Sequence, residues 1–497
     1  MATDAPSTST SSPADLTVDV VVLGGGPVGE NVAQYAIEGT DLTAAIVETE
    51  LLGGECSYYA CIPSKALLRP PAVADAAAHL PGITTPEIDR AALLARRDTW
   101  VSQYDDAGQV AWAEGAGMQV VRGYGRIVGE REVLVEAADG STATRVHARR
   151  AVVLATGSEA VIPAPLRELL PWTSRDATGV REVPEDLVII GGGVVAVEAA
   201  TWMAALGSRV RLLVRGSSLL SGYEPFAGTH VRDALRGLGV DVQFGASVLG
   251  GEREQARSTG LGRLHGGRVT LQVEDAGGRR EVSADEVLAA TGRRPRLADV
   301  GLDSIGLTAQ DVTGTESVTS DDATGAPLPK WLQVVGDASG DAPLTHWGKY
   351  RARVIGQAIR AGATGEALEP LPEQVPVPQV VFTDPQVTSV GLTEQAAREA
   401  GHEVVTAQVP FGGAAGSALL RDDVSGTAQL VVDRSARTLL GATFVGPDAS
   451  EMLHAATLAI VGQVPVHVLR HAVPSFPTAS ELWLRLLEAL PRELRGG

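Results

Sequence analysis

The residues most able to do chemistry are Cys56 and Cys61, the only two cysteines of the chain. A structural disulfide usually closes a longer loop, because a short closure removes little entropy from the unfolded chain. Without a signal-peptide pattern, so close a pair indicates redox chemistry or metal binding. Metal binding is the weaker alternative, because no His, Asp or Glu cluster lies nearby at a ligand-like spacing, and we expect no metal site.

The spacing of the two cysteines limits the backbone that can carry them. A disulfide requires its two Cα atoms to lie within about 7 Å of one another. Residues five positions apart on an ideal helix are separated by about 8 to 9 Å. We therefore expect Cys56 on a distorted first turn and Cys61 near the start of a helix, where the helix N-terminus favours a thiolate.

A glycine turn precedes the cysteines and predicts a dinucleotide site. The apolar run Val18–Leu23 is typical of a buried parallel strand, and a helix and a strand ending at Glu48 follow the turn. The small residues of the turn are Gly24, Gly26 and Gly29. They permit the tight turn, the approach of the pyrophosphate and close helix packing, and Glu48 is placed to bind a ribose.

The same pattern returns in the middle of the chain. The strand Leu187–Ile190 is followed by Gly191, Gly193 and Ala196, then by a helix and a strand ending at Val214. Two such units predict two bound dinucleotides. Similar segments, Ala151–Gly157 and Val287–Gly292, follow the two units.

The remaining sequence shifts in composition. Prolines between 370 and 378 predict a linker, beyond which alternating strands and helices predict an α+β domain. We expect a disordered lead-in over Met1–Asp15 and a surface loop over Gly250–Gly267. The net charge is −19. It argues against a nucleic-acid partner, and no apolar run is long enough to cross a membrane, so we expect a cytoplasmic protein.

The run GGECSYYACIPSK, from Gly53 to Lys65, resembles the redox-disulfide motif of the pyridine nucleotide–disulfide oxidoreductases. The glycine turns, Gly336-Asp337 with Leu344-Thr345-His346, and Phe382–Pro385 are also similar to that family. The resemblance implies an α/β fold with two Rossmann-like dinucleotide-binding domains and a C-terminal α+β dimerisation domain. The implied ranges are an FAD-binding domain at 16–160, an NAD(P)-binding domain at 161–293, a central part completing the FAD domain at 294–368, and a dimerisation domain at 369–497.

The resemblance also implies roles for single residues. Cys61 is the thiol facing the flavin, Cys56 is the interchange thiol, and Lys65 contacts the flavin while pairing with Glu198 beside the nicotinamide. Besides Lys65, the residues implied for FAD are Gly24, Gly26, Gly29, Glu48, Gly125, Thr156, Gly157, Asp337, Leu344, Thr345 and His346. Those implied for NAD(P) are Gly191, Gly193, Ala196, Glu198, Arg215 and Gly292.

The choice of nicotinamide cofactor depends on the end of the second strand of the NAD(P) unit. NAD-specific proteins carry an acid there, whereas this chain has Val214 followed by Arg215. The pattern resembles that of glutathione reductase, and Arg215 could hold a 2′-phosphate. We therefore favour NADPH over NADH, although Ser221 stands where the family has a second arginine.

One departure from the family concerns proton transfer. The family's C-terminal His-Pro-Thr-x-x-Glu stands here as Phe476-Pro477-Thr478-Ala479-Ser480-Glu481, so the orienting glutamate is kept and the catalytic histidine is replaced. Phenylalanine cannot accept a proton, and general acid–base catalysis contributes about 10²- to 10⁴-fold. His471, Tyr58 or Tyr59 could substitute, the leaving thiol could need no help, or the acceptor could differ from a disulfide.

The family resemblance implies a homodimer, and with the glycine turns and the cysteine pair it predicts an FAD-dependent enzyme. Electrons would pass from NAD(P)H through the flavin and the Cys56–Cys61 pair to a disulfide or a related small-molecule acceptor. A quinone or dye reductase with auxiliary cysteines, and an atypical dihydrolipoamide dehydrogenase, are the alternatives.

Overall fold

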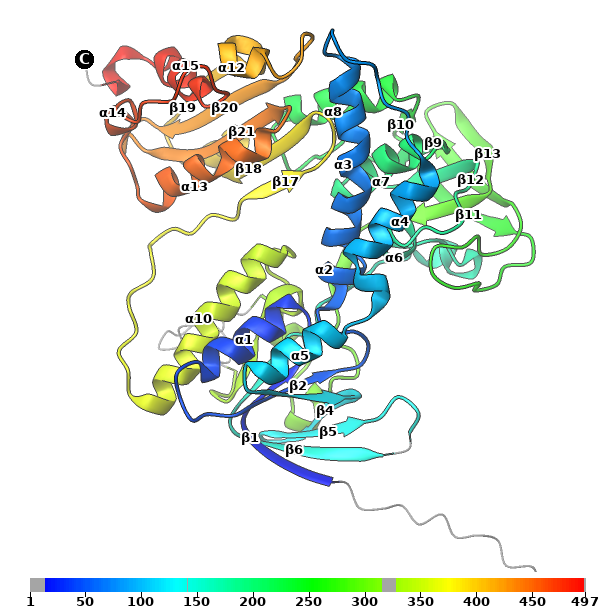
Figure 1. The fold of residues 1–497 in the computed structure, drawn as a ribbon, viewed down its shortest axis with the longest axis vertical. Coiled ribbons are helices and arrows are strands. Elements are labelled where there is room, and N and C mark those ends of the chain that lie inside the picture. Colours follow the sequence, from blue (N-terminus) through cyan, green and yellow to red (C-terminus); the bar gives the residue numbers. More distant parts are fainter. Residues whose placement is uncertain (1–13, 141, 315–327, 496–497) are drawn as a thin grey trace, which may run out of the picture. The chain divides into compact units, whose positions relative to one another are not determined.

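A computed structural model describes residues 14–140, 142–314 and 328–495 (Figure 1). The chain forms two compact units, each assembled from three separate stretches of sequence. The first unit comprises Met1–Ile62, Val101–Glu159 and Arg293–Glu369. The second unit comprises Pro63–Trp100, Ala160–Gly292 and Pro370–Gly497.

The first unit is built on a seven-stranded sheet with the order β3-β2-β1-β6-β5-β4, and β16 pairs with β6. Strands β3, β2, β1, β6 and β16 run parallel, whereas β4 and β5 pair antiparallel. Buried valines dominate β1, and buried alanine, isoleucine and valine fill β2, as expected for parallel strands covered on both faces. The bounds are β1 Ala14–Leu23, β2 Ala44–Glu48, β3 Met118–Arg122, β4 Tyr124–Gly129, β5 Glu132–Glu136, β6 Ala143–Leu154 and β16 Leu332–Val334.

Helices of the first unit position the glycine turn and the cysteines. Helix α1 (Pro27–Ile37) packs against α10 (Thr345–Thr364), and small residues of α10 allow the contact. A Cβ atom on Gly356 would lie 2.6 Å from Cβ of Tyr35, and one on Gly348 would lie 2.5 Å from a methyl of Val28. The other helices are α2 Gly54–Tyr58, α5 Ala107–Gly115 and α9 Ala309–Val312.

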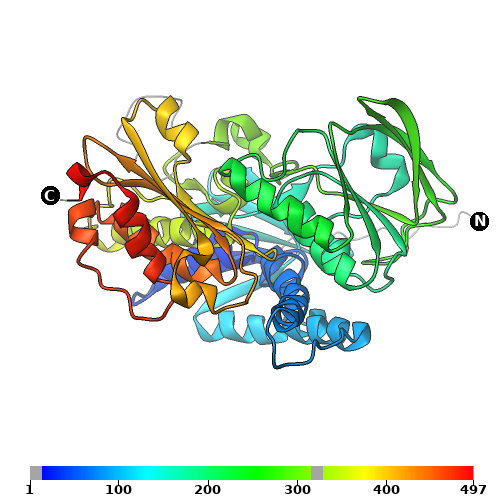
Figure 2. The same ribbon diagram turned by 90° about the horizontal axis from the view of Figure 1, so that it is seen from above.

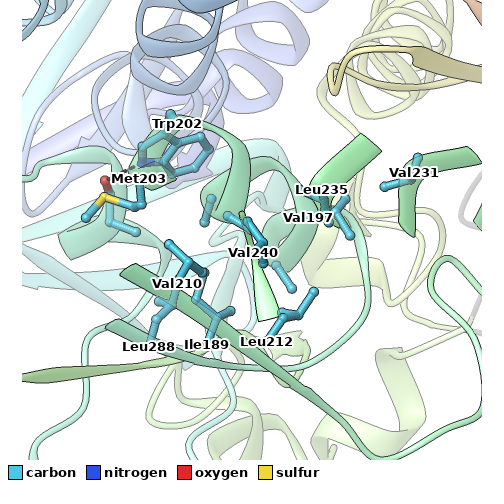
Figure 3. Packing of buried hydrophobic residues seen from close by; sticks show 14 of the residues in the cluster. Ile189, Val197, Trp202, Met203, Val210, Leu212, Val231, Leu235, Val240 and Leu288 are labelled. Carbon is cyan, nitrogen blue, oxygen red and sulfur yellow. Dashed lines mark hydrogen bonds between the residues drawn. The ribbon is translucent and has the colours of Figure 1, made fainter. Parts of the chain in front are cut away.

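The second unit contains a parallel sheet with the order β10-β9-β8-β14 and an antiparallel sheet β11-β12-β13. Figure 3 shows Trp202 and Met203 among the buried side chains that pack helix α7 onto this parallel sheet. The bounds are β8 Asp186–Ile190, α7 Val194–Ala205, β9 Arg209–Val214, α8 Pro225–Gly237, β10 Asp241–Phe244, β11 Ser247–Arg253, β12 Val269–Asp275, β13 Gly278–Ala284 and β14 Glu286–Ala289.

The C-terminal part of the second unit is a five-stranded antiparallel sheet with the order β17-β18-β21-β20-β19. Helices α13 and α15, orange and red in Figure 2, contribute to one core with the apolar face of this sheet. The bounds are β17 Gln379–Val381, β18 Gln386–Gly391, α11 Glu394–Glu399, β19 Val404–Pro410, α12 Ala415–Ala418, β20 Thr427–Asp433, β21 Leu439–Gly446, α13 Leu453–Val461, α14 Val466–Leu469 and α15 Glu481–Ala489.

Helix α3 (Cys61–Ala78) begins in the first unit and continues into the second. From Pro63 onward the helix belongs to the second unit, together with α4 (Arg90–Trp100) and α6 (Ser174–Thr178). No helix among the described residues is long and apolar enough to span a lipid bilayer.

Two expectations about local structure are corrected. The predicted loop Gly250–Gly267 begins inside strand β11. Its Gly-rich composition did not indicate a strand, but pairing with β12 provides the backbone hydrogen bonds that form one. The predicted lead-in overlaps β1, since Ala14 and Asp15 pair with Thr144 and Arg145 of β6, and its first thirteen residues lie outside the described part.

Candidate functional site

The two cysteines lie on different helices, as their spacing predicted. Cys56 is on the short helix α2, and Cys61 is the first residue of α3. A hydrogen bond with Cys61, together with burial, raises the pKa of the Cys56 thiol well above its usual range. The pair therefore resists losing both protons, and the first negative charge belongs to the pair as a whole.

Thr345 is the third polar group beside these thiols. Its Oγ1 lies 3.4 Å from Sγ of Cys61, and its hydroxyl also lowers the pKa of the Cys56 thiol. Because Thr345 begins helix α10, the starts of α3 and α10 both point to the cysteine pair. Helix N-termini favour negative charge, so this arrangement suits a thiolate.

Two glycines fix the cysteine-bearing turn to the first glycine turn. Gly53 has a φ of 106°, and its N–H donates to the carbonyl of Gly25 at 2.7 Å. Gly54 has a φ of 59°, and a Cβ atom there would lie 2.6 Å from Cα of Gly26. The redox pair is thus held directly against the predicted pyrophosphate site.

The first glycine turn has the form that a bound dinucleotide needs. Gly24 has a φ of 105°, and a side chain there would collide with the carbonyl of Ala155, 2.3 Å away. A Cβ atom on Gly29 would lie 1.9 Å from the carbonyl oxygen of Gly24. Beside this turn, Glu48, Gly125 and Thr156 line a recess of about 70 Å³. The close approaches at Gly24 and Gly29 leave no room for side chains, as expected of a dinucleotide-binding turn.

The carboxylate of Glu48 also stabilises the turn itself. Its Oε2 accepts from the N–H of Gly25 at 2.7 Å, and its Oε1 accepts from the N–H of Glu50 at 2.7 Å. A hydrogen bond to a ribose would have to share these oxygens, each of which retains a second lone pair.

Asp337 belongs to a chain of hydrogen bonds that the sequence analysis did not find. Ser158 donates to Oδ2 of Asp337 at 2.5 Å and accepts from Nε of Arg293 at 2.8 Å. Arg293 also reaches Glu55, the residue before Cys56, at 3.4 Å. The network thus connects a predicted FAD residue to the cysteine-bearing helix. The repeated Ala-Thr-Gly segments were the available signal, because Ser158 and Arg293 immediately follow them.

The other residues predicted to bind FAD also lie in the first unit, and their surroundings differ. Gly157 has a φ of 73°, and a Cβ atom on it would meet nothing within 4 Å. Leu344 is the N-cap of α10, and His346 is exposed on the first turn of that helix. Within the run 344–346, Thr345 contacts the Cys61 thiol.

The second glycine turn repeats the geometry of the first. Gly191 has a φ of 135°, and a Cβ atom there would lie 2.2 Å from the carbonyl oxygen of Ala290. Gly193 precedes helix α7 and has open space beside it, whereas Ala196 is fully buried. The start of α7 therefore offers free N–H groups to a phosphate.

The residues that would distinguish NADPH from NADH lie at the end of β9. Val214 is buried against Gly192, with its Cγ1 2.8 Å from where a Cβ atom of that glycine would be. Arg215 follows the strand and is exposed, as a phosphate ligand must be. Gly292, the last predicted NAD(P) residue, has a φ of 119°.

Lys65 and Glu198 form an ion pair within the second unit. Nζ of Lys65 lies 2.8 Å from Oε2 of Glu198, whose side chain is 5% exposed. The other carboxylate oxygen accepts from the N–H of Phe382 at 2.9 Å, and Nζ of Lys65 lies 4.6 Å from the centroid of the Phe382 ring. Both Glu198 oxygens and the Lys65 charge are therefore held in fixed positions.

At the C-terminus, Phe476 is 76% exposed while Glu481 is 8% exposed. Oε1 of Glu481 accepts from Arg485 at 2.9 Å, but Oε2 is buried with no hydrogen-bond partner among the described residues. An orienting carboxylate is thus retained without an imidazole to orient.

The three candidate substitutes for the histidine differ in their surroundings. His471 is exposed just after α14, as is typical of a surface histidine. Burial raises the pKa of Tyr58 to about 12, which keeps its hydroxyl protonated at neutral pH and unable to act as a base. Tyr59 is half-buried, with its ring centroid 5.7 Å from that of Tyr104.

Comparisons with known proteins identify the family of the chain. Residues 18–336 match the family model described as pyridine nucleotide-disulphide oxidoreductase, and residues 377–486 match the dimerisation domain of that family. A dihydrolipoyl dehydrogenase of Thermus scotoductus is 33% identical over 96% of this chain and 98% of its own length. A mercuric reductase of Staphylococcus aureus is 28% identical over 93% of this chain and 80% of its own length.

A solved structure shares the fold as well. The HOCl-induced flavoprotein disulfide reductase RclA from Escherichia coli superimposes with a TM-score of 0.76 at 23% identity, over 95% of this chain and 99% of that one. The chain therefore belongs to the pyridine nucleotide-disulphide oxidoreductases, a family of FAD-dependent enzymes that use NAD(P)H.

Proposed function

We propose that this enzyme transfers electrons from NADPH, through FAD and the Cys56–Cys61 pair, to a disulfide or a related electrophilic small molecule. The observation that carries the proposal is the contact between the thiol of Cys56 on α2 and that of Cys61 at the start of α3, with the hydroxyl of Thr345 beside them.

Bound FAD would supply two-electron chemistry between the reduced nicotinamide and the Cys56–Cys61 disulfide. The disulfide would become a dithiol by taking up two electrons and one proton that originate from the nicotinamide hydride, and a second proton from solvent. Lys65 and Glu198 are the side chains proposed to hold fixed charges beside the reacting rings. Their support is the 2.8 Å ion pair and its anchor on the Phe382 N–H.

The second half-reaction uses only the cysteines and the acceptor. The Cys56 thiolate attacks one sulfur of the acceptor disulfide, forming a mixed disulfide and releasing a thiolate. The Cys61 thiolate then attacks Cys56, which restores the intramolecular disulfide and releases the second thiolate. Two protons, one from each enzyme thiol, leave with the two product thiols.

Relatives named for dihydrolipoyl dehydrogenase and mercuric reductase use different acceptors, so membership does not select one. The chain has no cysteine after Cys61, which argues against a mercuric reductase with a C-terminal cysteine pair. Phe476 in place of the histidine argues against ordinary dihydrolipoamide dehydrogenase, because the leaving thiolate then lacks its acid.

Anaerobic titration with NADPH tests the proposal. After two electrons, a long-wavelength band from a thiolate beside the oxidised flavin is expected in the wild type and absent in Cys61→Ser. Cys56→Ser should abolish reduction of disulfides while leaving the reduction of the flavin by NADPH intact. Direct bleaching of the wild-type flavin without this band would show that the cysteine pair is not coupled to the flavin.

A quinone reductase is the second candidate, and the exposure of Phe476 favours it. An aromatic ring that is 76% exposed can stack on a planar acceptor, whereas it can transfer no proton. In that enzyme the cysteines are auxiliary, so Cys56→Ser should retain quinone reduction and Phe476→Ala should raise the KM for quinone.

The preference for NADPH rests on the exposed Arg215 after β9, with Val214 where an acid would repel a 2′-phosphate. Arg215→Ala is expected to lower kcat/KM for NADPH about 10- to 100-fold, as loss of a charged hydrogen bond implies, with little change for NADH. A wild-type preference for NADH would refute this role.

We also infer a homodimer, supported by the match to the dimerisation domain. Light scattering coupled to size-exclusion chromatography tests it, since a monomeric mass of 51.5 kDa would contradict it. The cytoplasmic location stays a prediction.

A further inference from the structure

A pocket of about 370 Å³ in the first unit gathers four cationic side chains: Arg131, Arg149, Arg150 and Lys330. Its lining residue Ala151 pairs with Val20, three residues before the carboxyl end of β1 at Leu23, which the glycine turn follows. The cations are therefore separate from the predicted FAD recess, whose lining includes Gly24, Glu48 and Thr156.

A β-bulge places two successive arginines on the same side. The register between β1 and β6 shifts between Val18 and Val20, so that Arg149 and Arg150 both stand opposite Asp19. Arg149 lies 3.3 Å and Arg150 lies 3.7 Å from that carboxylate. In a regular strand these side chains would point to opposite faces, and bulges commonly re-aim side chains in this way.

The other two cations come from neighbouring backbone segments. Arg131 has a φ of 57° in the turn between β4 and β5, and its guanidinium donates to the carbonyl of Arg149 at 3.3 Å. Its carboxylate partner is Glu130, at 2.8 Å. Lys330 precedes β16, and within 14–140, 142–314 and 328–495 no carboxylate forms an ion pair with it.

The local charge is positive in a strongly acidic chain. Four cations face two carboxylates, Asp19 and Glu130, which leaves 4 − 2 = +2 where the chain as a whole carries −19. Helix α10 contributes apolar residues to the lining of the pocket, among them Ile355 and Ile359. The pocket thus offers two positive charges in excess beside an aliphatic surface.

We propose that this pocket binds a phosphate monoester whose organic part is compact and apolar. A phosphate monoester carries about −1.5 to −2 charges at neutral pH, which matches the excess of +2. Arginine forks bind phosphate oxygens in pairs, and the lysine adds a point charge. Ile355 and Ile359 would cover the organic part.

Calorimetric titration of the FAD-loaded full-length enzyme with phenyl phosphate tests the proposal, alongside inorganic phosphate and benzyl alcohol. Phenyl phosphate should bind saturably, more tightly than inorganic phosphate, and benzyl alcohol should not bind. Lys330→Gln and Arg150→Gln should each lower the affinity for phenyl phosphate about tenfold or more, as expected for loss of a charged hydrogen bond. If Arg150→Gln fails to retain FAD, Lys330→Gln decides alone.

Two matched controls separate this pocket from general attraction and from the NAD(P) site. Arg360 is a cation of helix α10, which also lines the pocket, but it is paired with Glu38 and Glu366. The Arg360→Gln variant should bind phenyl phosphate as the wild type does. Arg215→Gln should also bind normally. Absent binding to the wild type, equal weakening in Arg360→Gln, or loss only in Arg215→Gln would overturn the proposal. Equal affinities for inorganic phosphate and phenyl phosphate would overturn the proposal that the ligand has an apolar organic part.

Discussion

The ammonium of Lys65 lies 2.8 Å from Oε2 of Glu198, although the two residues are 133 positions apart. Lys65 follows Cys61 by one turn of α3, and Glu198 lies on the helix that begins at the second glycine turn. The pair therefore links the helix of the redox cysteine with the helix proposed to receive NADPH.

Glu198→Gln should slow the reduction of bound FAD by NADPH about 10- to 100-fold. Loss of the carboxylate leaves the Lys65 ammonium without the partner that fixes its position, and a charged hydrogen bond contributes about 1.5 to 3 kcal/mol. Stopped-flow absorbance of the flavin measures the rate. Lys349→Gln, a change at an exposed lysine of α10, is the control. An unchanged rate in Glu198→Gln would contradict a role for the pair.

Thr345→Val should make Cys56 less reactive. The Thr345 hydroxyl lowers the pKa of the Cys56 thiol, opposing the larger rise caused by Cys61 and burial, so its removal raises that pKa further. With a hydrogen bond contributing about 1 kcal/mol, alkylation of the reduced enzyme by iodoacetamide at pH 8 should slow about fivefold. Thr345→Ser keeps the hydroxyl and should react as the wild type does. Equal rates in all three proteins would exclude the contact as a functional one.

Phe476→His should create the missing proton-transfer group. Oε2 of Glu481 is buried without a partner among the described residues, and it is available to orient an imidazole. Reduction of lipoamide, a cyclic disulfide, should rise by up to about 10²-fold, the lower end of general acid–base catalysis.

Phe476→Ala is the control for that experiment, because it removes the ring without adding a base. If both variants gain equally, the benefit comes from space rather than from proton transfer. If neither gains, the acceptor is not limited by protonation of its leaving thiolate.

Asp384 predicts a pH-dependent stability. Burial, then the neighbouring Asp75 carboxylate, raise its pKa to about 6, against the opposing charge of Arg421 3.6 Å away. Between about pH 4 and 6 the folded protein thus binds more protons than the unfolded chain, and this group's contribution falls as pH rises.

Asp384→Asn removes the charge that must be buried above pH 6. At about 1.4 kcal/mol per pKa unit, the gain at pH 7 is of the order of 1 to 3 kcal/mol. The apparent Tm of the Asp384→Asn holoenzyme should be measured from pH 4 to 8. It should be higher than the wild-type Tm at pH 7 and should converge with the wild-type Tm near pH 4. Asp423→Asn, a change at the more exposed partner of Arg421, is the control. A lower Tm for Asp384→Asn at pH 7 would show that the Arg421 contact outweighs burial.

Local sequence was enough to predict the two glycine turns. Gly24 and Gly191 have positive φ angles and approach the carbonyls of Ala155 and Ala290. Residues with a side chain would be strained in this conformation. Local sequence was not enough to predict β11, whose glycines are unfavourable in a strand and which forms because it pairs with β12. Pairing with a neighbouring strand outweighed composition there.

The sequence by itself determined the close cysteine pair, the two glycine turns and the presence of Phe476 where the family has a histidine, because these depend on residue type and short spacing. Only the tertiary structure decided that Thr345 touches the thiols, that Ser158 and Arg293 join Asp337 to Glu55, and that four cations share one pocket. Spacing along the chain governs backbone conformation within a turn or a helix. Contacts between residues more than a hundred positions apart form only when separate elements pack, and their partners cannot be read from local pattern.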